Sequence, residues 1–444
     1  MVRRTRRSWV TLTAGMAGVA LVATGCSSGS DSASDTASEA TGTEPVTLSV
    51  ATFNEFGYED LFPEYEELNP NVTIEAKKAA TSNEARDNLN TRLAAGSGAS
   101  DIEAIEVDWL PELSQFPDKF VDLNDPAVDG RWLDWKVAQA TTPDGVLIGY
   151  GTDIGPEGIC YRADLLEEAG LPTDREDVKE LLGGDAATWD KYFEVGEQFV
   201  AADTGPGWFD SAGATYQGLI NQVQNAYEDN DNNIVALENP EVKAIYEQVL
   251  AASATQSAQV GQWSEDWVNA FQKDGFATML CPGWMLGVIG NIDEDGEQTG
   301  NAAGVEGWDI ADVFPGGGGN WGGSFLTVPA MGENQAEAKK LANWLTAPEQ
   351  QIKAFQAKGT FPSQTAALVD PELQAQTDEF FNDAPTGTIL ANRAEAVTVA
   401  PYKGPNYFAI NDAMQQALSR VDVDETDDPA SSWSKFEADV NNLG

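Results

Sequence analysis

The amino-acid sequence predicts an α/β fold in which helices cover a mainly parallel β-sheet. After residue 45, short apolar segments alternate with amphipathic ones in the order strand, helix, strand, helix, strand. This order is typical of parallel sheets, because parallel neighbours need a crossover connection that is usually a helix. We expect the strands at residues 47–53, 71–77 and 102–107, and the helices at 57–68 and 84–94.

The second of these helices has the clearest boundary. Leu89 and Leu93 lie one turn apart on the same face, and Gly96 and Gly98 follow. Glycine ends helices readily because it adopts left-handed backbone torsions without steric cost. The pattern therefore predicts a helix that packs through its leucines and stops before Gly96.

Polar residues follow the first and third predicted strands. Asn54 and Glu55 come after the first strand, and Asp108, followed by Trp109, comes after the third. In open α/β sheets, ligands bind beyond the carboxyl ends of the strands. These four residues are therefore candidate ligand contacts, with a place in the core as the alternative for Trp109.

Alternation of helices and strands continues through the rest of the chain. We expect helices at 186–202 and 240–252, a short strand at 276–281, and a helix pair over 334–359. In the helix pair, Leu341, Trp344 and Leu345 share an apolar face, and Pro348 opens the second helix. Trp344 is accordingly expected to pack in the core.

A glycine-rich stretch, "GGGGNWGGSFLTVP", occupies residues 316–329 and runs into a predicted strand at 324–328. Only Asn320 and Trp321 interrupt its glycines. Glycine costs conformational entropy wherever the fold fixes it, so such a run marks unusual torsions or the close approach of another group.

The first residues resemble an export signal. Four arginines precede an apolar segment, which ends in "LVATGC" at residues 21–26 and is too short to remain as a membrane span. This predicts a lipoprotein signal peptide over 1–25 and a lipid on Cys26, with an ordinary secretory signal as the alternative. Arg6 and Arg7 also fit twin-arginine export. Residues 26–44, rich in Ser, Thr, Gly and acids, are expected to form a disordered tether.

Composition excludes several classes of function. The formal net charge of −47 opposes binding to nucleic acid. The chain contains no histidine, which excludes a Ser-His-Asp triad, a Cys-His pair and histidine metal ligands. The segment at 229–233 begins like a calcium loop, but Ile234 and Pro240 stand where the loop needs glycine and glutamate. We expect no cofactor and no metal, while a glycosidase that uses two carboxylates stays open.

Two cysteines remain once Cys26 carries lipid. Cys160 and Cys281 both follow strand-like segments, and the predicted compartment is oxidising. We expect a disulfide between them, formed across neighbouring parallel strands, with two inert buried thiols as the alternative.

Several segments resemble the family 1 solute-binding lipoproteins of bacterial ABC sugar importers, specifically those of high-GC Gram-positive bacteria. The resemblance spans the mature chain, and its clearest segments are "SVATFNEF", "GPEGICYRADLLEEAGLPTD", "FATMLCPGWM", "NWGGSFLTVP", "NWLTAPEQQIKAF" and "GTFPSQ". Within that family the chain looks closest to binders of cellobiose and cello-oligosaccharides, whereas other relatives take xylo-, chito- or malto-oligosaccharides.

The resemblance implies a two-lobed, periplasmic-binding-protein-like α/β fold of type II, as in maltose-binding protein, with a hinge and an interlobe cleft. Lobe 1 would comprise residues 45–153 and 306–356, and lobe 2 residues 154–305 and 357–444. The segment "YGTDIGPEG", which includes Asp153, becomes the first hinge crossing. Its glycines would absorb torsion changes when the lobes close.

The resemblance also gives the glycine-rich stretch a role in sugar binding. Trp321 and Trp284 would form opposing platforms for sugar rings, and the bare backbone at Gly322 and Gly323 would admit hydroxyls. Trp263 and Trp267 are more suited to helix packing. The full set of expected contacts is Asn54, Glu55, Asp108, Trp109, Asp153, Phe209, Trp284, Asn320, Trp321, Gly322, Gly323 and Ser324.

These features predict a monomeric, non-enzymatic binding lipoprotein. It would sit on the outer face of the cell membrane, capture an oligosaccharide and deliver it to the permease subunits of an ABC transporter. A secreted carbohydrate-active enzyme is the alternative from another class, and a peptide-binding importer component is a minor one.

Overall fold

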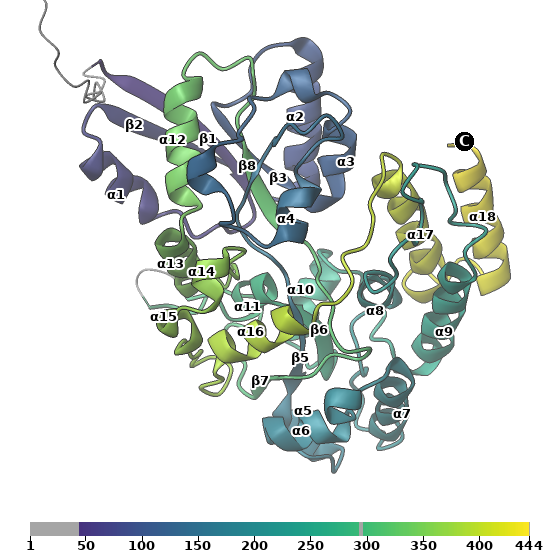
Figure 1. Cartoon of the computed structure of the whole chain (residues 1–444). Helices are drawn as coiled ribbons and strands as arrows, with labels where there is room; N and C mark the ends of the chain where they lie inside the picture. Colours follow the sequence, from purple (N-terminus) through teal and green to yellow (C-terminus); the bar gives the residue numbers. More distant parts are fainter. Residues whose placement is uncertain (1–43, 293–295, 444) are drawn as a thin grey trace, which may run out of the picture. The chain divides into compact units, whose positions relative to one another are not determined.

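The computed structural model describes residues 44–292 and 296–443, so the predicted signal peptide, Cys26 and nearly all of the tether lie outside the described residues. Two separate β-sheets form in this part, each covered by helices (Figure 1). The larger sheet has the order β2-β1-β3-β8-β4, and the smaller has the order β6-β5-β7. The strands are β1 (Val46–Phe53), β2 (Val72–Ala79), β3 (Ile102–Glu106), β4 (Tyr150–Gly151), β5 (Glu157–Arg162), β6 (Thr278–Pro282), β7 (Trp308–Ala311) and β8 (Ser324–Thr327).

The larger sheet is mixed rather than mainly parallel. β1 pairs in parallel with β2 and β3, as the βαβαβ pattern predicts. β8 pairs antiparallel with β3 and with β4. β4 and β8 come from parts of the sequence that lie outside the βαβαβ segment. The local pattern therefore contained no signal of their direction in the sheet.

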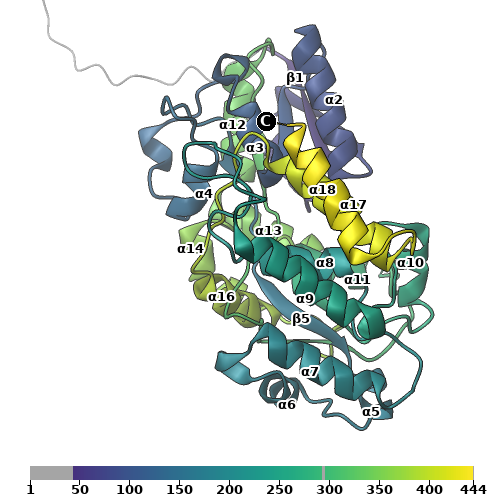
Figure 2. The same cartoon turned by 90° about the vertical axis from the view of Figure 1, so that its right-hand side faces the viewer.

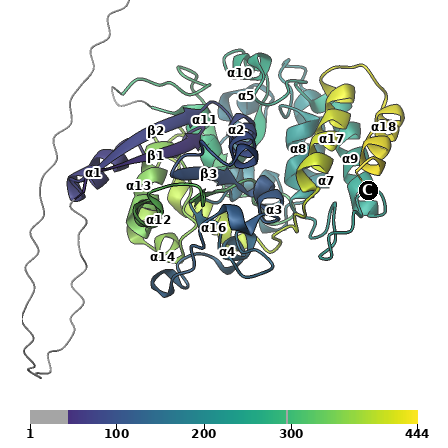
Figure 3. The ribbon, with the colours of Figure 1, turned by 90° about the horizontal axis from the view of Figure 1, so that it is seen from above.

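Helices pack on both faces of the larger sheet. In Figure 3, α2 lies on one side of it, and α1 and α12 lie on the other. Leu89 and Leu93 of α2 and Leu341 and Leu345 of α12 are buried in one core. Trp344 packs on Tyr65 with ring centroids 5.2 Å apart, which is a structural role as expected. The helices of this part are α1 (Leu61–Leu68), α2 (Ser82–Ala95), η1 (Val107–Trp109), α3 (Leu110–Leu113), η2 (Pro117–Lys119), η3 (Pro126–Val128), α4 (Asp134–Gln139), α12 (Gln335–Leu345) and α13 (Pro348–Lys358).

The smaller sheet separates two further cores. Ile159 and Tyr161 of β5 face one core, and Cys160 between them faces the other, as the two-residue period of a strand requires. In Figure 2, α17 and α18 run beside α9 on the first side. The helices of this part are α5 (Ala163–Glu168), α6 (Arg175–Leu181), η4 (Gly184–Ala186), α7 (Trp189–Val200), α8 (Ala212–Ile220), α9 (Pro240–Gln256), α10 (Glu265–Phe271), α11 (Gly283–Gly290), α14 (Thr365–Leu368), α15 (Pro371–Gln374), α16 (Thr386–Ala396), α17 (Tyr407–Asp422) and α18 (Pro429–Asn441). Within the described residues, no helix is long and apolar enough to cross a membrane.

One expected lobe boundary differs from the structure. β7 was expected in lobe 1, since the boundary was placed at 305/306, but it pairs with β5 in the smaller sheet. The chain returns to the larger sheet only at β8, so the crossing occupies residues 312–323 and contains the glycine run. Isolated bridges tie the crossings together: Asp153 pairs with Pro362, and Pro156 pairs with Asn320. The third crossing occupies residues 359–364, between α13 and α14. Three crossings therefore lie side by side.

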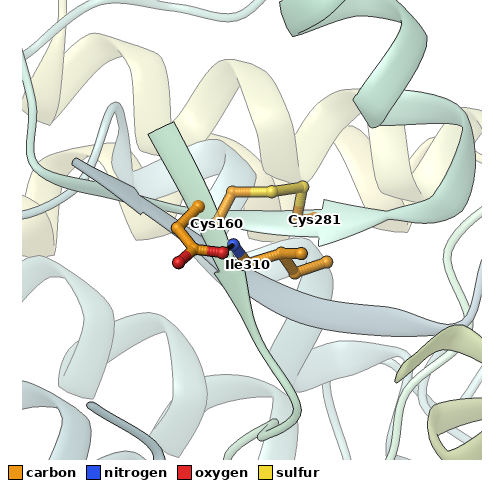
Figure 4. Close-up of a disulfide and its surroundings, with 4 residues drawn as sticks. Cys160, Cys281 and Ile310 are labelled. Atoms are coloured by element: carbon orange, nitrogen blue, oxygen red, sulfur yellow. Dashed lines mark hydrogen bonds between the residues drawn. A yellow bond between two sulfur atoms is a disulfide. The ribbon is translucent and has the colours of Figure 1, made fainter. Parts of the chain in front are cut away.

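The structure contains the expected disulfide between Cys160 and Cys281, whose Cα atoms are 5.4 Å apart (Figure 4). The two strands that carry the cysteines are antiparallel, which corrects the expectation of parallel neighbours. Cys160 lies opposite Met279, and Cys281 lies opposite Gly158, so the bridge runs diagonally across the pair. Both side chains are completely buried in the same core.

Candidate functional site

Two of the three crossings are held together by backbone and amide hydrogen bonds. The Trp321 amide donates to the Gly155 carbonyl at 2.8 Å, and the Gly155 amide donates to Asn320 Oδ1 at 2.9 Å. Asn320 Nδ2 donates in turn to the Gly322 carbonyl at 3.0 Å. A Cβ atom on Gly155 would overlap the Trp321 carbonyl oxygen, so this position requires glycine. Asn320 thus braces the crossings and is absent from the lining of the cavity described next, so its expected ligand contact stays a prediction.

A cavity of about 450 Å³ opens beside these crossings, and we call it the cleft cavity. Strand ends of the larger sheet supply one wall, and Trp284 at the start of α11, directly after β6, supplies part of the other. Its position matches the rule that ligands bind beyond the carboxyl ends of the strands. Ten of the expected contacts line it, namely Asn54, Glu55, Asp108, Trp109, Asp153, Trp284, Trp321, Gly322, Gly323 and Ser324.

Three indoles form a continuous aromatic surface in the cleft cavity. Trp284 and Trp321 meet edge to face, with ring centroids 5.9 Å apart and an interplanar angle of 89°. They are therefore not opposing platforms, because two rings in contact at a right angle leave no slot for a sugar between them. Trp263 instead stacks near Trp284, with centroids 6.0 Å apart and an angle of 25°. Its side chain is 49% exposed, and Trp263 extends the surface toward solvent.

Trp267, four residues after Trp263, has a different role from Trp263. Trp267 is completely buried and donates from Nε1 to the Asp210 carboxylate at 3.0 Å. Trp263 itself lies before α10, at a φ of 70°, rather than on the helix. The two rings touch, with centroids 5.2 Å apart, but only Trp267 lies on the helix and is buried.

Carboxylates and a lysine meet at one end of the cleft cavity. Asp108 pairs with Lys403, which comes from the segment before α17. Glu106 Oε2 accepts the Asp108 amide at 2.8 Å. Burial and the neighbouring Asp108 carboxylate raise the pKa of Glu106 to about 8, against smaller opposing effects of Lys403 and Lys136. Glu106 therefore holds a proton near neutral pH and can donate a hydrogen bond as well as accept one.

A second buried charge supports the strand that follows the glycine run. Lys136 is 1% exposed, and its Nζ lies 3.7 Å from the centroid of the Phe325 ring. Burial lowers the pKa of Lys136 to about 7, although Asp153 and Glu106 oppose this effect. Asp153 Oδ1 accepts the Ser324 amide at 2.9 Å, which fixes the start of β8 against the first crossing. Asp153 is thus both a cavity wall and a structural brace.

The backbone conformation explains why residues 322 and 323 are glycines. Their φ angles are 78° and 112°, in the region that L-residues rarely adopt. A Cβ atom on Gly323 would lie 2.8 Å from the Asp153 carbonyl oxygen and 2.9 Å from Lys136 Nζ. The bare backbone therefore permits the tight turn into β8, in addition to lining the cavity.

Phe209 does not belong to the cleft cavity, which corrects its expected role. It is 1% exposed and packs in the core beneath α7, edge to face with Phe193 at 6.2 Å. Trp109 lines the cavity but is only 2% exposed, because its ring also packs against Phe53 at 5.8 Å. It contributes to the cavity floor and to the core at once.

Several cavity residues were not predicted as contacts. Asn83 lies in the first turn of α2, Phe408 in the first turn of α17, and Thr360 on the third crossing. Their positions at helix starts and crossings are visible only once the fold brings these segments to the strand ends. Among the described residues, no group of three or more Cys, Asp and Glu side chains is arranged to hold a metal ion.

Comparisons with known proteins agree on one family. The family model described as bacterial extracellular solute-binding protein matches residues 60–382. A lactose-binding protein of Rhizobium radiobacter is 26% identical over 369 residues, which cover 80% of this chain and 81% of the relative. The family-model match includes the end of β3, the start of α11 and the start of β8, which line the cleft cavity, and it begins after the end of β1.

Solved structures share the fold. A crystal structure described as an extracellular solute-binding protein of family 1 is 49% identical, with a TM-score of 0.78, and the match covers 90% of this chain and 99% of that one. A protein of B. animalis subsp. lactis, solved with β-1,6-galactobiose, is 18% identical with a TM-score of 0.74, covering 90% and 97%. The chain therefore has the two-lobed, maltose-binding-protein-like fold.

Proposed function

We propose that this chain, which belongs to the bacterial extracellular solute-binding proteins, captures a short oligosaccharide and delivers it to an ABC permease. Cellobiose and the longer cello-oligosaccharides are the best candidates. The observation that carries the proposal is the cleft cavity, which the three indoles line together with carboxyl and amide side chains.

This combination matches the two surfaces of a pyranose. The C–H faces of the ring pack on indoles, and the hydroxyls at its edge need donors and acceptors. Asn54, Asp108 and Ser324 supply polar groups at the strand ends. Glu106 adds a carboxyl that can act as a donor near neutral pH. The volume of about 450 Å³ suits a short sugar chain, since small-ligand sites span roughly 300–1,000 Å³.

Charge supports a neutral ligand rather than an anionic one. Besides the protonated Glu106, three acids line the cleft cavity, namely Glu55, Asp108 and Asp153. A phosphate or uronate would meet repulsion from them. The lactose-binding relative is consistent with a neutral sugar as ligand. The family consists of binding proteins, so the alternative of a carbohydrate-active enzyme is set aside.

The β-1,4-glucoside assignment depends on shape. In such a chain every ring is a chair with equatorial hydroxyls, so both faces of the ring expose C–H groups and the extended chain can lie along an aromatic surface. The stacked pair of Trp263 and Trp284 provides such a surface at the mouth of the cavity. An α-1,4-linked chain curves and would therefore follow this surface less far.

Delivery requires that the protein stays at the cell surface. Within the proposal, Cys26 carries a lipid, and the segment up to residue 44 tethers the two lobes as a monomer near the permease. If export uses the twin-arginine route, the protein crosses the membrane already folded. An exported protein is what the extracellular family implies.

A binding screen tests the proposal. Thermal shift and calorimetry with cellobiose, cellotriose, xylobiose, chitobiose, lactose and maltotriose should give stabilisation by the β-1,4-glucosides, because a ligand that binds only the folded state raises its apparent stability. The sugars should be recovered unchanged after incubation. Binding of maltotriose alone would refute the linkage assignment, and binding of a cationic peptide but no sugar would refute the function.

A further inference from the structure

A second cavity of about 430 Å³ lies on the other side of η1 from the cleft cavity. Neighbouring residues of this segment line both spaces: Asp108 and Trp109 face the cleft cavity, whereas Val107 and Leu110 face the second cavity. The segment that leads into α17, together with the first turn of that helix, also lines both cavities. Its residues 403–405 line the second cavity, and Phe408 lines the cleft cavity. Two strips of chain therefore form a partition that the cavities share.

The two strips meet at the ion pair between Asp108 and Lys403. Asp108 lines the cleft cavity, and Lys403 lines the second cavity. Burial opposes the charge of Lys403, but Asp108, Tyr407 and Glu106 outweigh it and raise the pKa of this lysine above its usual range. Its Nζ also lies 4.6 Å from the centroid of the Tyr407 ring. Lys403 therefore stays charged at neutral pH, and its ion pair with Asp108 joins the two strips of the partition.

The second cavity has the chemistry of a sugar subsite. Two aromatic residues, Trp135 and Tyr402, line it together with several side-chain amides. Gln139 Oε1 is buried there and has no hydrogen-bond partner among the described residues, so it can accept a bond from a ligand hydroxyl. Lys403 is the single charged residue in the lining. Aromatic faces and free amides, with little net charge, suit an uncharged pyranose.

We propose that the second cavity is a further carbohydrate subsite and that Lys403, held by Asp108, separates it from the cleft cavity and limits the length of the bound sugar. This inference rests on the proposed function. In the wild type, the cleft cavity alone determines affinity, so affinity stops rising once a chain fills it. Without the lysine side chain, the two spaces join, and a longer chain reaches Trp135 and Gln139.

The test is the dependence of affinity on chain length. Calorimetry with cellobiose to cellohexaose, or the same lengths of whichever β-linked series the wild type binds, should show no gain beyond the trisaccharide for the wild type. Lys403→Ala should raise the ratio of pentasaccharide to trisaccharide affinity by about tenfold, as expected for one added stacking contact. Adding Gln139→Ala and Trp135→Ala to Lys403→Ala should remove this gain, whereas the same two changes in the wild type should leave every affinity unchanged.

The outcomes distinguish the proposed role of Lys403 as a gate, which separates the two cavities, from simpler roles of this residue. If Lys403 only holds the lobes together, Lys403→Ala weakens every sugar by the same factor, and the gate is refuted. An unchanged length profile in a folded Lys403→Ala protein refutes it as well. Because the wild-type curves are measured in parallel, the absence of any sugar binding by the wild type would instead refute the proposed function. Thermal melting of each variant verifies that the protein is folded.

Discussion

The indole Nε1 of Trp284 donates a hydrogen bond of 2.9 Å to the carbonyl oxygen of Trp321. Trp284 packs against the core on the α11 side of the smaller sheet, and Trp321 packs against the core on its α7 side. The glycine-rich crossing and the start of α11 are thus joined at the aromatic surface of the cleft cavity. A change in either tryptophan should therefore alter ligand binding and the crossing together.

Trp263 offers the cleanest test of the aromatic surface. It is half exposed and stacks near Trp284, so Trp263→Ala removes sugar-packing area without opening a core cavity. We expect affinity for the β-glucoside to fall about tenfold, since aromatic contacts are worth roughly 0.5–1.5 kcal/mol beyond area burial. Trp344→Ala is the matched control, because this residue packs on Tyr65 away from the cleft cavity. It should lower the melting temperature and leave the affinity of the folded protein intact. Full affinity in Trp263→Ala would remove that ring from the site.

Gly155 should tolerate no side chain. A Cβ atom there would overlap the Trp321 carbonyl oxygen and approach Trp284 Nε1 to 3.0 Å. Gly155→Ala must push apart the two crossings, at a typical overpacking cost of about 1–3 kcal/mol. We expect a lower free energy of unfolding in urea and weaker sugar binding. Gly261→Ala is the control, since its Cβ would meet nothing closer than 3.9 Å. Equal stability of both variants would show that the crossings move freely past each other.

The Cys160–Cys281 disulfide should contribute mainly through the unfolded chain. It joins residues 121 positions apart, for which the chain-entropy model gives roughly 4–5 kcal/mol. We expect the double variant Cys160→Ser, Cys281→Ser, made in a soluble form that starts after Cys26, to melt at a lower temperature. The native wild type should resist reductant, because both sulfurs are buried. Two thiols that react after denaturation without reductant would contradict the pairing.

The membrane anchor is tested by a single change. Cys26→Ala removes the only residue of "LVATGC" that can carry the lipid, so we expect the protein to appear in the medium or to remain unprocessed. Cell fractionation and mass spectrometry of the mature N-terminus give the readout. Ser27→Ala, at the adjacent position, should leave the anchor in place. An unmodified Cys26 on surface-retained wild-type protein would contradict the expectation.

Local sequence patterns predicted those parts of the fold that depend on local contacts. β1, α1, β2 and α2 form in the predicted order, and α2, which ends before Gly96, spans Ser82–Ala95 against an expected 84–94. The direction of β8 was not predictable, because its partner β3 lies more than 200 residues earlier. β7 was assigned to the wrong lobe for the same reason, since only its pairing with β5 reveals which sheet it joins.

The same distinction between local and long-range contacts applies to the candidate site. Residues next to strand ends, such as Asn54 and Asp108, were predicted by a general rule of α/β sheets and do line the cleft cavity. Glu106 was missed because it reads as one more polar residue of an alternating strand. Its raised pKa comes from burial and from Asp108, and the fold that buries it also brings Lys403, about 300 positions away, into an ion pair with Asp108. Phe209 was misplaced because neighbouring sequence does not distinguish an aromatic that faces a cavity from one that faces a core.

Glu106 should make the stability of the protein depend on pH. Burial and Asp108 raise its pKa from 4.5 to about 8, so the folded state holds a proton that the unfolded state releases near pH 4.5. This stabilising contribution is fully present below pH 4.5 and is lost as the pH rises through about 8. Glu106→Gln keeps an oxygen that can accept the Asp108 amide but cannot ionise. The melting temperature of Glu106→Gln relative to wild type should therefore rise between pH 5 and pH 9.

Two features make this comparison specific. Asp108, Lys136 and Lys403 are present in both proteins, so the variant removes only the ionisable group at position 106. Glu75→Gln, on the exposed surface of β2, removes a carboxylate that already lies in water and should show no such trend. Differential scanning fluorimetry at constant ionic strength measures all three proteins. A constant difference between Glu106→Gln and wild type across this range would mean that Glu106 is already charged at pH 5, because hydrogen-bond donors then stabilise its carboxylate, and that it binds sugar only as an acceptor.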